Sequence, residues 1–210
     1  MRYRAVVFDF DGTIIDTEQH LFEVINEHLM THQKDPISVE YYRQSIGGAA
    51  KDLHHYITSQ IGEQATKGLY EAHHYKSQYL PMINNIKRLM EQLEQKQIPF
   101  AIATSSSRLA IQPALQALGL VDRVPVIVGR EDVEAVKPEP DLYLTAVQQM
   151  NLNPVSCLAI EDSVNGATAA QRAGLGLIVN TNQMTEHMDF SHLNLEGMNM
   201  DAETIMAQCF

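Results

Sequence analysis

The stretch Ala5-Val-Val-Phe-Asp-Phe-Asp-Gly-Thr13 decides the fold and the place of the chemistry. Residues 5–8 are a short apolar run with two β-branched side chains, which predicts a buried strand. Asp9 and Asp11 follow directly. Side chains two positions apart in an extended chain point the same way, so both carboxylates face one side. Gly12 then lets the backbone leave the strand sharply.

Similar apolar runs recur along the chain, each bounded by polar residues or glycine. The further predicted strands span 99–103, 124–128, 157–160 and 177–179. The predicted helices between and after them span 86–96, 113–118, 141–150, 164–173 and 202–208, with 181–197 as loop. Pro113 suits a first helical position. Alternating strands and helices predict an α/β core, a parallel sheet covered on both faces.

Residues 16–82 break this alternation, because they hold helical patterns and no convincing strand. A helical insertion after the first strand, leaving from and returning to the same edge of the sheet, is the simplest account. We therefore expect a catalytic core formed by residues 1–15 and 83–210, and an all-helical cap domain formed by residues 16–82.

The composition is that of an ordinary globular protein, with 210 residues, 45% apolar and 20% charged. It excludes a disordered or collagen-like chain. No run approaches the roughly 20 apolar residues that span a bilayer, and the apolar part of the amino terminus is short for a signal peptide, so we expect a cytoplasmic protein with no membrane partner. A net charge of −11 repels phosphate backbones, which makes nucleic acid an improbable partner. The sequence predicts no oligomeric state.

Polar and charged residues follow four of the predicted strands. These segments are 9–13, 104–107, 137–140 and 161–163. Ligands of an open parallel sheet bind beyond the carboxyl ends of its strands, where all four segments would converge. The sequence therefore predicts one site along this rim.

The chemistry of that rim points to a metal and a phosphate group. Up to four carboxylates would share one cleft, those of Asp9, Asp11, Glu161 and Asp162. Like charges repel each other, so cations must join them, and ligation by oxygen alone suits Mg²⁺. Lys137 adds a positive charge and Ser105 a hydroxyl donor. With the backbone amides around Gly12, these groups predict a phosphate cradle.

Two of the carboxylates are suited to different parts of a phosphoryl transfer. Asp9 can attack phosphorus in line and form an aspartyl-phosphate. Asp11 can protonate the leaving oxygen and then take a proton from the incoming water. A covalent route is favoured because uncatalysed hydrolysis of phosphate monoesters is among the slowest of reactions.

These motifs carry a resemblance to a known family. Asp9-Phe-Asp-Gly-Thr, Ser105, Lys137-Pro and Glu161-Asp-Ser resemble, in order and over nearly the whole chain, the four motifs of the haloacid dehalogenase superfamily. The helical insert resembles the small cap of the subgroup containing β-phosphoglucomutase and sugar-phosphate phosphatases. The resemblance implies a Rossmann-like core, Mg²⁺, Asp9 as nucleophile and Asp11 as acid and base. It also implies metal contacts from Asp9, the main-chain carbonyl of Asp11 and Asp162, with Glu161 close by or behind a water.

The predicted function is that of a Mg²⁺-dependent phosphatase acting on a small phosphorylated metabolite, a sugar phosphate. The predicted substrate-binding residues, beside the catalytic Ser105 and Lys137, are Gly12, Thr13, Ser106 and Lys51. Thr13 favours a phosphatase, since β-phosphoglucomutase tends to have an apolar residue there. A β-phosphoglucomutase-type phosphomutase stays open as the alternative, and Lys51 stands where that enzyme has an arginine. A phospho-accepting signalling module is a remote alternative, because such a domain is shorter and lacks a helical insert.

The pairs His54-His55 and His73-His74 are tempting as zinc ligands. Adjacent residues on a helix face different ways, so neither pair can chelate one ion together. We interpret them as surface or packing histidines.

Overall fold

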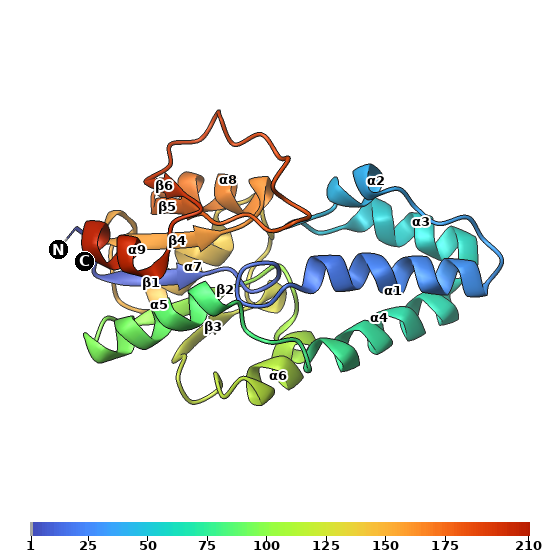
Figure 1. Cartoon of the computed structure of the whole chain (residues 1–210), viewed down its shortest axis with the longest axis horizontal. Helices are drawn as coiled ribbons and strands as arrows, with labels where there is room; N and C mark the ends of the chain where they lie inside the picture. The colour runs from blue at the N-terminus through green and yellow to red at the C-terminus, as the bar shows by residue number, and fades with distance from the viewer. Residues whose placement is uncertain (1) are drawn as a thin grey trace.

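The computed structural model describes residues 2–210, and its centre is a parallel β-sheet (Figure 1). In this part of the chain the strands lie in the order β3-β2-β1-β4-β5-β6, and every neighbouring pair is parallel. Their bounds are Ala5–Phe8 (β1), Phe100–Ala103 (β2), Val126–Val128 (β3), Cys157–Glu161 (β4), Gly176–Val179 (β5) and Gly197–Met198 (β6). The predicted α/β class is confirmed.

Helices cover both faces of this sheet. One face packs against α5 (Asn84–Gln95), α6 (Arg108–Ala117) and α9 (Ala202–Cys209), and the other against α7 (Asp141–Gln149) and α8 (Val164–Ala173). Val6 and Phe8 of β1 lie in the first layer, and Ala5 and Val7 lie in the second. Because side chains alternate along a strand, a strand covered on both faces is apolar throughout.

Four helices between β1 and α5 lie beyond the sheet and share a hydrophobic cluster of their own (Figure 1). They are α1 (Thr17–Thr31), α2 (Val39–Arg43), α3 (Lys51–Ile61) and α4 (Glu63–Ser77). The chain leaves the sheet and returns to it at adjoining points, since Ile15 forms an antiparallel bridge with Met82. The predicted helical insert is confirmed; its limits at residues 16 and 82 stay a prediction.

Two elements differ from the prediction. Helix α6 begins at Arg108, and Pro113 lies inside it. The Ser107 hydroxyl accepts a hydrogen bond from the Ala110 amide at 3.2 Å and so caps the helix before the proline is reached. Strand β6 falls at the end of a segment predicted as loop, because two residues are too few to show an alternating pattern.

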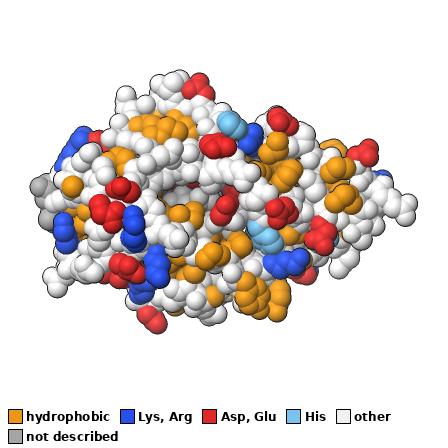
Figure 2. All heavy atoms as spheres, in the orientation of Figure 1, with side chains coloured by type: hydrophobic (Ala, Val, Ile, Leu, Met, Phe, Trp, Pro, Cys, Tyr) orange, Lys and Arg blue, Asp and Glu red, His pale blue; other side chains and the backbone are white. Residues whose placement is uncertain are grey.

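Acidic side chains are spread over both ends of the molecule on the face shown in Figure 2, and the net charge of the chain is −11. No helix within residues 2–210 is long and apolar enough to cross a membrane. With so acidic a surface, binding of an anion depends on cations gathered locally.

Candidate active site

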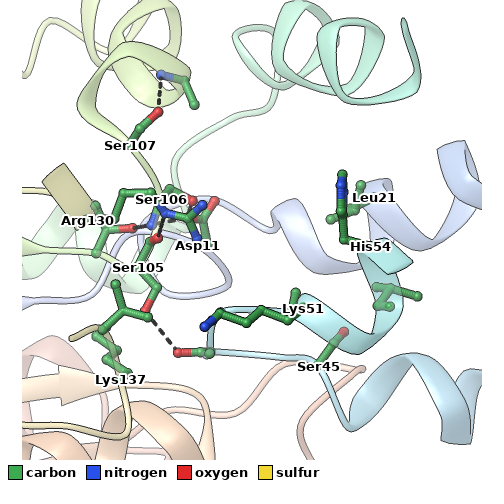
Figure 3. A pocket seen from close by; sticks show the side chains of 18 of the residues that line it. Asp11, Leu21, Ser45, Lys51, His54, Ser105, Ser106, Ser107, Arg130 and Lys137 are labelled. Carbon is green, nitrogen blue, oxygen red and sulfur yellow. Dashed lines mark hydrogen bonds between the residues drawn. The ribbon is translucent and has the colours of Figure 1, made fainter. Parts of the chain in front are cut away.

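A cavity of about 1210 Å³ lies between the four helices of the insert and the carboxyl end of the sheet. Asp9 and Asp11 line it from the end of β1, Ser105 from the end of β2 and Lys137 from the loop after β3. Lys51 extends into it from the start of α3 on the opposite wall (Figure 3). Residues far apart in the sequence thus meet at the predicted rim.

A buried acidic cluster adjoins this cavity, and of its three carboxylate residues Asp9 lines the cavity whereas Glu161 and Asp162 are not among the described lining residues. Among residues 2–210, Asp9, Glu161 and Asp162 are the one group of three side chains whose ligand atoms lie within 4.8 Å of one another. The ammonium group of Lys137, itself buried, donates to Asp9 and to Glu161 Oε1, the latter at 2.6 Å. One lysine cannot balance three carboxylates.

The electrostatics of this cluster fit a divalent cation. Burial raises the pKa of Asp9, although Lys137 opposes the rise. Burial and the neighbouring charge of Asp9 raise the pKa of Asp162. The pKa of Lys137 is raised by its two carboxylate partners, against the effect of its burial. A buried cluster of carboxylates with a deficit of positive charge matches the preference of Mg²⁺ for oxygen ligands.

Glu161 is held by protein groups on both carboxylate oxygens. Oε1 accepts from Lys137 and from the Tyr143 hydroxyl at 2.6 Å, and Oε2 accepts from the amide of Asp162 at 3.1 Å. Asp9 and Asp162 are therefore the carboxylates with oxygen atoms left for a metal. Tyr143 was not singled out from the sequence, because a tyrosine in an amphipathic helix looks like core packing.

Asp11 lies in a ring of hydroxyl groups. Its carboxylate accepts from Thr17 at 2.9 Å and from Thr104 at 3.2 Å. It also accepts from Ser106 at 2.7 Å, which lies beside it in Figure 3. The hydroxyl of Ser106, a predicted substrate-binding residue, thus donates its hydrogen bond to Asp11. The side chain of Asp11 also lies outside the acidic cluster.

Gly12 and Thr13 are not among the described residues that line the main cavity. They line a separate cavity of about 320 Å³, and the Thr13 hydroxyl is buried without a hydrogen-bonding partner within residues 2–210. The substrate-binding role of Gly12 and Thr13 therefore stays a prediction. Gly12 has another reason to be glycine: its φ is +82°, and a Cβ atom there would collide with the Asp162 carboxylate.

The phosphate-binding groups predicted on the two walls do face each other. The Ser105 hydroxyl donates to the Gly47 carbonyl at 3.1 Å, which brings the loop before α3 onto the core. Arg130, which the sequence did not single out, donates from Nε to the Ser105 carbonyl at 2.9 Å and lines the same cavity. Lys51, Arg130 and Lys137 are the described cationic side chains that line the cavity, apart from imidazoles.

Rings from the insert form much of the opposite wall. His54, His55, His73 and His74 all line the cavity, so the surface-or-packing interpretation is incomplete for them. His73 does pack: it is buried and stacks on His20 with ring centroids 5.1 Å apart. Burial lowers the pKa of His73 to about 3, and His74 and His20 add to this effect.

Because His73 is neutral in the folded protein, we expect stability to fall as the pH drops from 6.5 towards 3. Its folded pKa lies below its ordinary value of 6.5, so over this range the unfolded chain binds a proton that the folded chain does not. The loss at pH 5 amounts to about 2 kcal/mol. Urea unfolding at pH 7 and pH 5 should show that the wild type loses about this much more stability than His73→Gln. Equal losses in the two proteins would contradict a buried neutral imidazole.

Sequence comparison identifies the class to which this fold and cluster belong. A model of the haloacid dehalogenase-like hydrolase family matches residues 6–180. YhcW of Bacillus subtilis is 34% identical over 213 residues, covering 93% of this chain and 92% of that protein. The chain therefore belongs to the haloacid dehalogenase-like hydrolases, in their β-phosphoglucomutase- and CbbY-like group. This membership confirms the resemblance and removes the signalling-module alternative.

Two further relatives and one solved structure show the range of this group. β-Phosphoglucomutase of Bacillus subtilis is 32% identical over 187 residues, covering 82% of this chain and 80% of that protein. The phosphorylated carbohydrates phosphatase of Thermotoga maritima is 27% identical over 177 residues, with 81% and 82% covered. The crystal structure of CbbY from Rhodobacter sphaeroides in complex with phosphate has the same fold, with a TM-score of 0.80, 24% identity and 97% and 96% of the two chains covered.

Proposed function

We propose that the protein is a Mg²⁺-dependent phosphatase that hydrolyses a small phosphorylated metabolite, a sugar phosphate, through an aspartyl-phosphate on Asp9. The observation that carries the proposal is the juxtaposition of Asp9, Asp162 and Lys137, of which Asp9 and Lys137 line one large cavity. The phosphatase of phosphorylated carbohydrates among the relatives supports the substrate class.

The metal would be held by Asp9 and Asp162, together with the main-chain carbonyl of Asp11 that the family motif implies. Glu161 would not bind the metal directly, because its oxygen atoms already accept from Lys137, Tyr143 and backbone amides. It would hold Lys137 in place beside the metal site. When bound, Mg²⁺ supplies neutralisation of the charge on the phosphoryl oxygens. All other chemistry falls to side chains of this chain.

The proposed reaction divides into two displacements at phosphorus. An oxygen of Asp9 forms a bond to phosphorus while the bond to the leaving oxygen breaks, and Asp11 gives that oxygen its proton. Water then attacks the phosphorus, Asp11 takes back a proton, and the bond to Asp9 breaks. Free phosphate and the original enzyme result.

The surrounding groups would bind the phosphoryl group and orient the acid. Lys137 would neutralise the phosphoryl group and Ser105 would donate to one of its oxygens once released from Gly47. The three hydroxyl groups that contact Asp11, those of Thr17, Thr104 and Ser106, would fix its carboxyl group towards the leaving oxygen.

Residues 16–82 would act as a cap that closes over the substrate and selects it. The cavity lies between this part and the core, and Lys51 reaches into it from the cap side. Closure excludes water and strengthens the local field of the cations. The hinge would fall at the bridge between Ile15 and Met82, where the two chain crossings lie side by side.

A panel of sugar phosphates tests the proposal. We expect the enzyme to release inorganic phosphate at a rate that falls about 100-fold or more in EDTA and recovers when Mg²⁺ is added. Without a cation the acidic cluster repels the anionic substrate. A panel with no turnover, or with turnover indifferent to EDTA, would contradict it.

Two observations support a phosphomutase as the second candidate function. They are the 32% identity to β-phosphoglucomutase and the cationic Lys51 on the cap side of the cavity. The choice between the two functions is decided by the product from β-glucose 1-phosphate with a trace of the 1,6-bisphosphate. We expect glucose and free phosphate. Formation of glucose 6-phosphate without free phosphate would establish the mutase instead.

A further inference from the structure

The turn at residues 182–184, just beyond β5, contacts both the loop after β1, at Gly12, and the acidic cluster, at Asp162. Asn182 Nδ2 donates to the main-chain oxygen of Gly12 at 3.1 Å and to Asp162 Oδ2 at 2.7 Å. Within residues 2–210, Asp162 accepts no other side-chain hydrogen bond. The direction of this buried carboxylate therefore depends on a single amide.

The amide of Asn182 is itself fixed. Its Oδ1 accepts from the backbone amides of Met184 at 2.9 Å and Thr185 at 3.2 Å. The Thr185 hydroxyl in turn accepts from the Asn182 backbone amide at 3.0 Å. Because the oxygen side of the amide is committed to two N–H donors, the NH₂ side must face Asp162.

The same turn is bound to the helical cap. Arg43 at the end of α2 donates from Nε to the Met184 carbonyl at 2.9 Å and from Nη2 to the Gln183 carbonyl at 3.2 Å. The Met184 side chain is buried and belongs to the hydrophobic cluster of the cap helices. Figure 1 shows the chain after β5, drawn in red, reaching from the sheet to the helical end beside α2.

We propose that Asn182 is a positioning residue that orients Asp162 for metal binding, and that Arg43 and Met184 make this orientation depend on the place of the cap. The inference rests on the metal site of the proposed function. Outer hydrogen bonds to a ligand strengthen metal binding because they hold the ligand in its binding orientation beforehand. Movement of α2 would pull the turn, and with it the amide that aims Asp162. By linkage, a bound ion must steady the cap to the same extent.

Direct binding of Mn²⁺, followed by electron paramagnetic resonance without substrate, tests the positioning role. Mn²⁺ accepts the same oxygen ligands as Mg²⁺. We expect Asn182→Ser to weaken Mn²⁺ binding about tenfold. Serine keeps an oxygen to accept from the turn amides but is too short to reach Asp162. Asn182→Ala provides a second variant should the serine protein fold poorly.

Asn180→Ala is the matched control. Asn180 lies two residues earlier, and its side chain bonds only to the backbone of Met200 among the described contacts. We expect this variant to bind Mn²⁺ like the wild type even if its melting temperature falls. A loss of affinity equal to that of Asn182→Ser would show that general loosening of the segment is responsible and would overturn the proposal.

The dependence on the cap is tested by Arg43→Ala. We expect a loss of Mn²⁺ affinity of about two- to tenfold, although Arg43 touches no residue of the acidic cluster. In Asn182→Ser, which lacks the amide, the same change should have a smaller effect, since coupled residues are not additive. An Arg43→Ala protein with wild-type affinity would overturn the link to the cap.

The outcomes separate this inference from the proposed function. If the wild type fails to bind Mn²⁺, the metal site of the proposed function is wrong and the inference falls with it. If the wild type binds Mn²⁺ and Asn182→Ser binds it equally well, the positioning role alone is wrong.

Discussion

Asp9→Asn is expected to lower kcat by about 10⁴-fold or more, because an amide cannot act as the nucleophile that forms the phosphoenzyme. Asp9 stands at the end of β1 with its carboxylate in the cavity and bonded to Lys137. Replacement by asparagine keeps the shape and an oxygen atom for Lys137 but removes the negative charge. Initial rates of phosphate release measure the effect.

The fold should survive this change. Burial and neighbouring carboxylates already disfavour the charged form of Asp9, so Asp9→Asn relieves repulsion with Asp162. We expect its melting temperature in EDTA to be no lower than that of the wild type. Asp122→Asn, an exposed change of the same kind, should retain full activity. More than about one per cent residual turnover in Asp9→Asn would remove the covalent route.

Lys137→Met is expected to cost about 3–5 kcal/mol of stability in metal-free buffer, since it leaves buried carboxylates without their cation. The Lys137 ammonium is bonded to Asp9 and Glu161 and lies 5.1 Å from the centre of the Tyr143 ring. Methionine has a similar unbranched shape, so the cavity left behind is small. Urea unfolding in EDTA gives the loss.

Added Mg²⁺ should restore part of that stability, because an ion bound to the folded state alone stabilises it. Lys96→Met, at an exposed position after α5, is the control and should change stability little. If Lys137→Met unfolds in EDTA at the same urea concentration as the wild type, the ammonium group does not hold the cluster together.

Much of the site follows from one rule applied to the sequence, that ligands bind beyond the carboxyl ends of parallel strands. The rule predicts that Asp9, Ser105, Lys137 and Asp162 lie together; the first three line one cavity, and Asp162 lies behind it beside Asp9. The rule also applies to the end of β5, which the four predicted segments leave out, and there Asn180-Thr181-Asn182 follows the strand in the same way. The sequence pattern therefore indicates Asn182 as a site residue as well, although its polar side chain carries no charge that would mark it.

The directions of the Ser106 and Arg130 side chains could not be predicted from one amino-acid sequence. Which way Ser106 turns, towards substrate or towards Asp11, is settled by a rotamer and by the closeness of the two loops. The same holds for Arg130, whose contact with the Ser105 carbonyl depends on how the loop after β3 packs. Spacing along the sequence predicts which segments meet, but it does not fix side-chain direction within a loop.

The paired crossing at Ile15 and Met82 has a consequence beyond hinge motion. Both ends of the helical insertion are anchored at one spot, so its length and contents can change at little entropic cost, which grows only with the logarithm of length. The sheet need not adjust when that happens, as long as α2 keeps the contact of Arg43 with the turn at residues 182–184. The residues that recognise the metabolite lie mainly in the insert, and the residues that cleave the phosphoester lie in the core. The sequences of these two parts can therefore change at different rates during evolution.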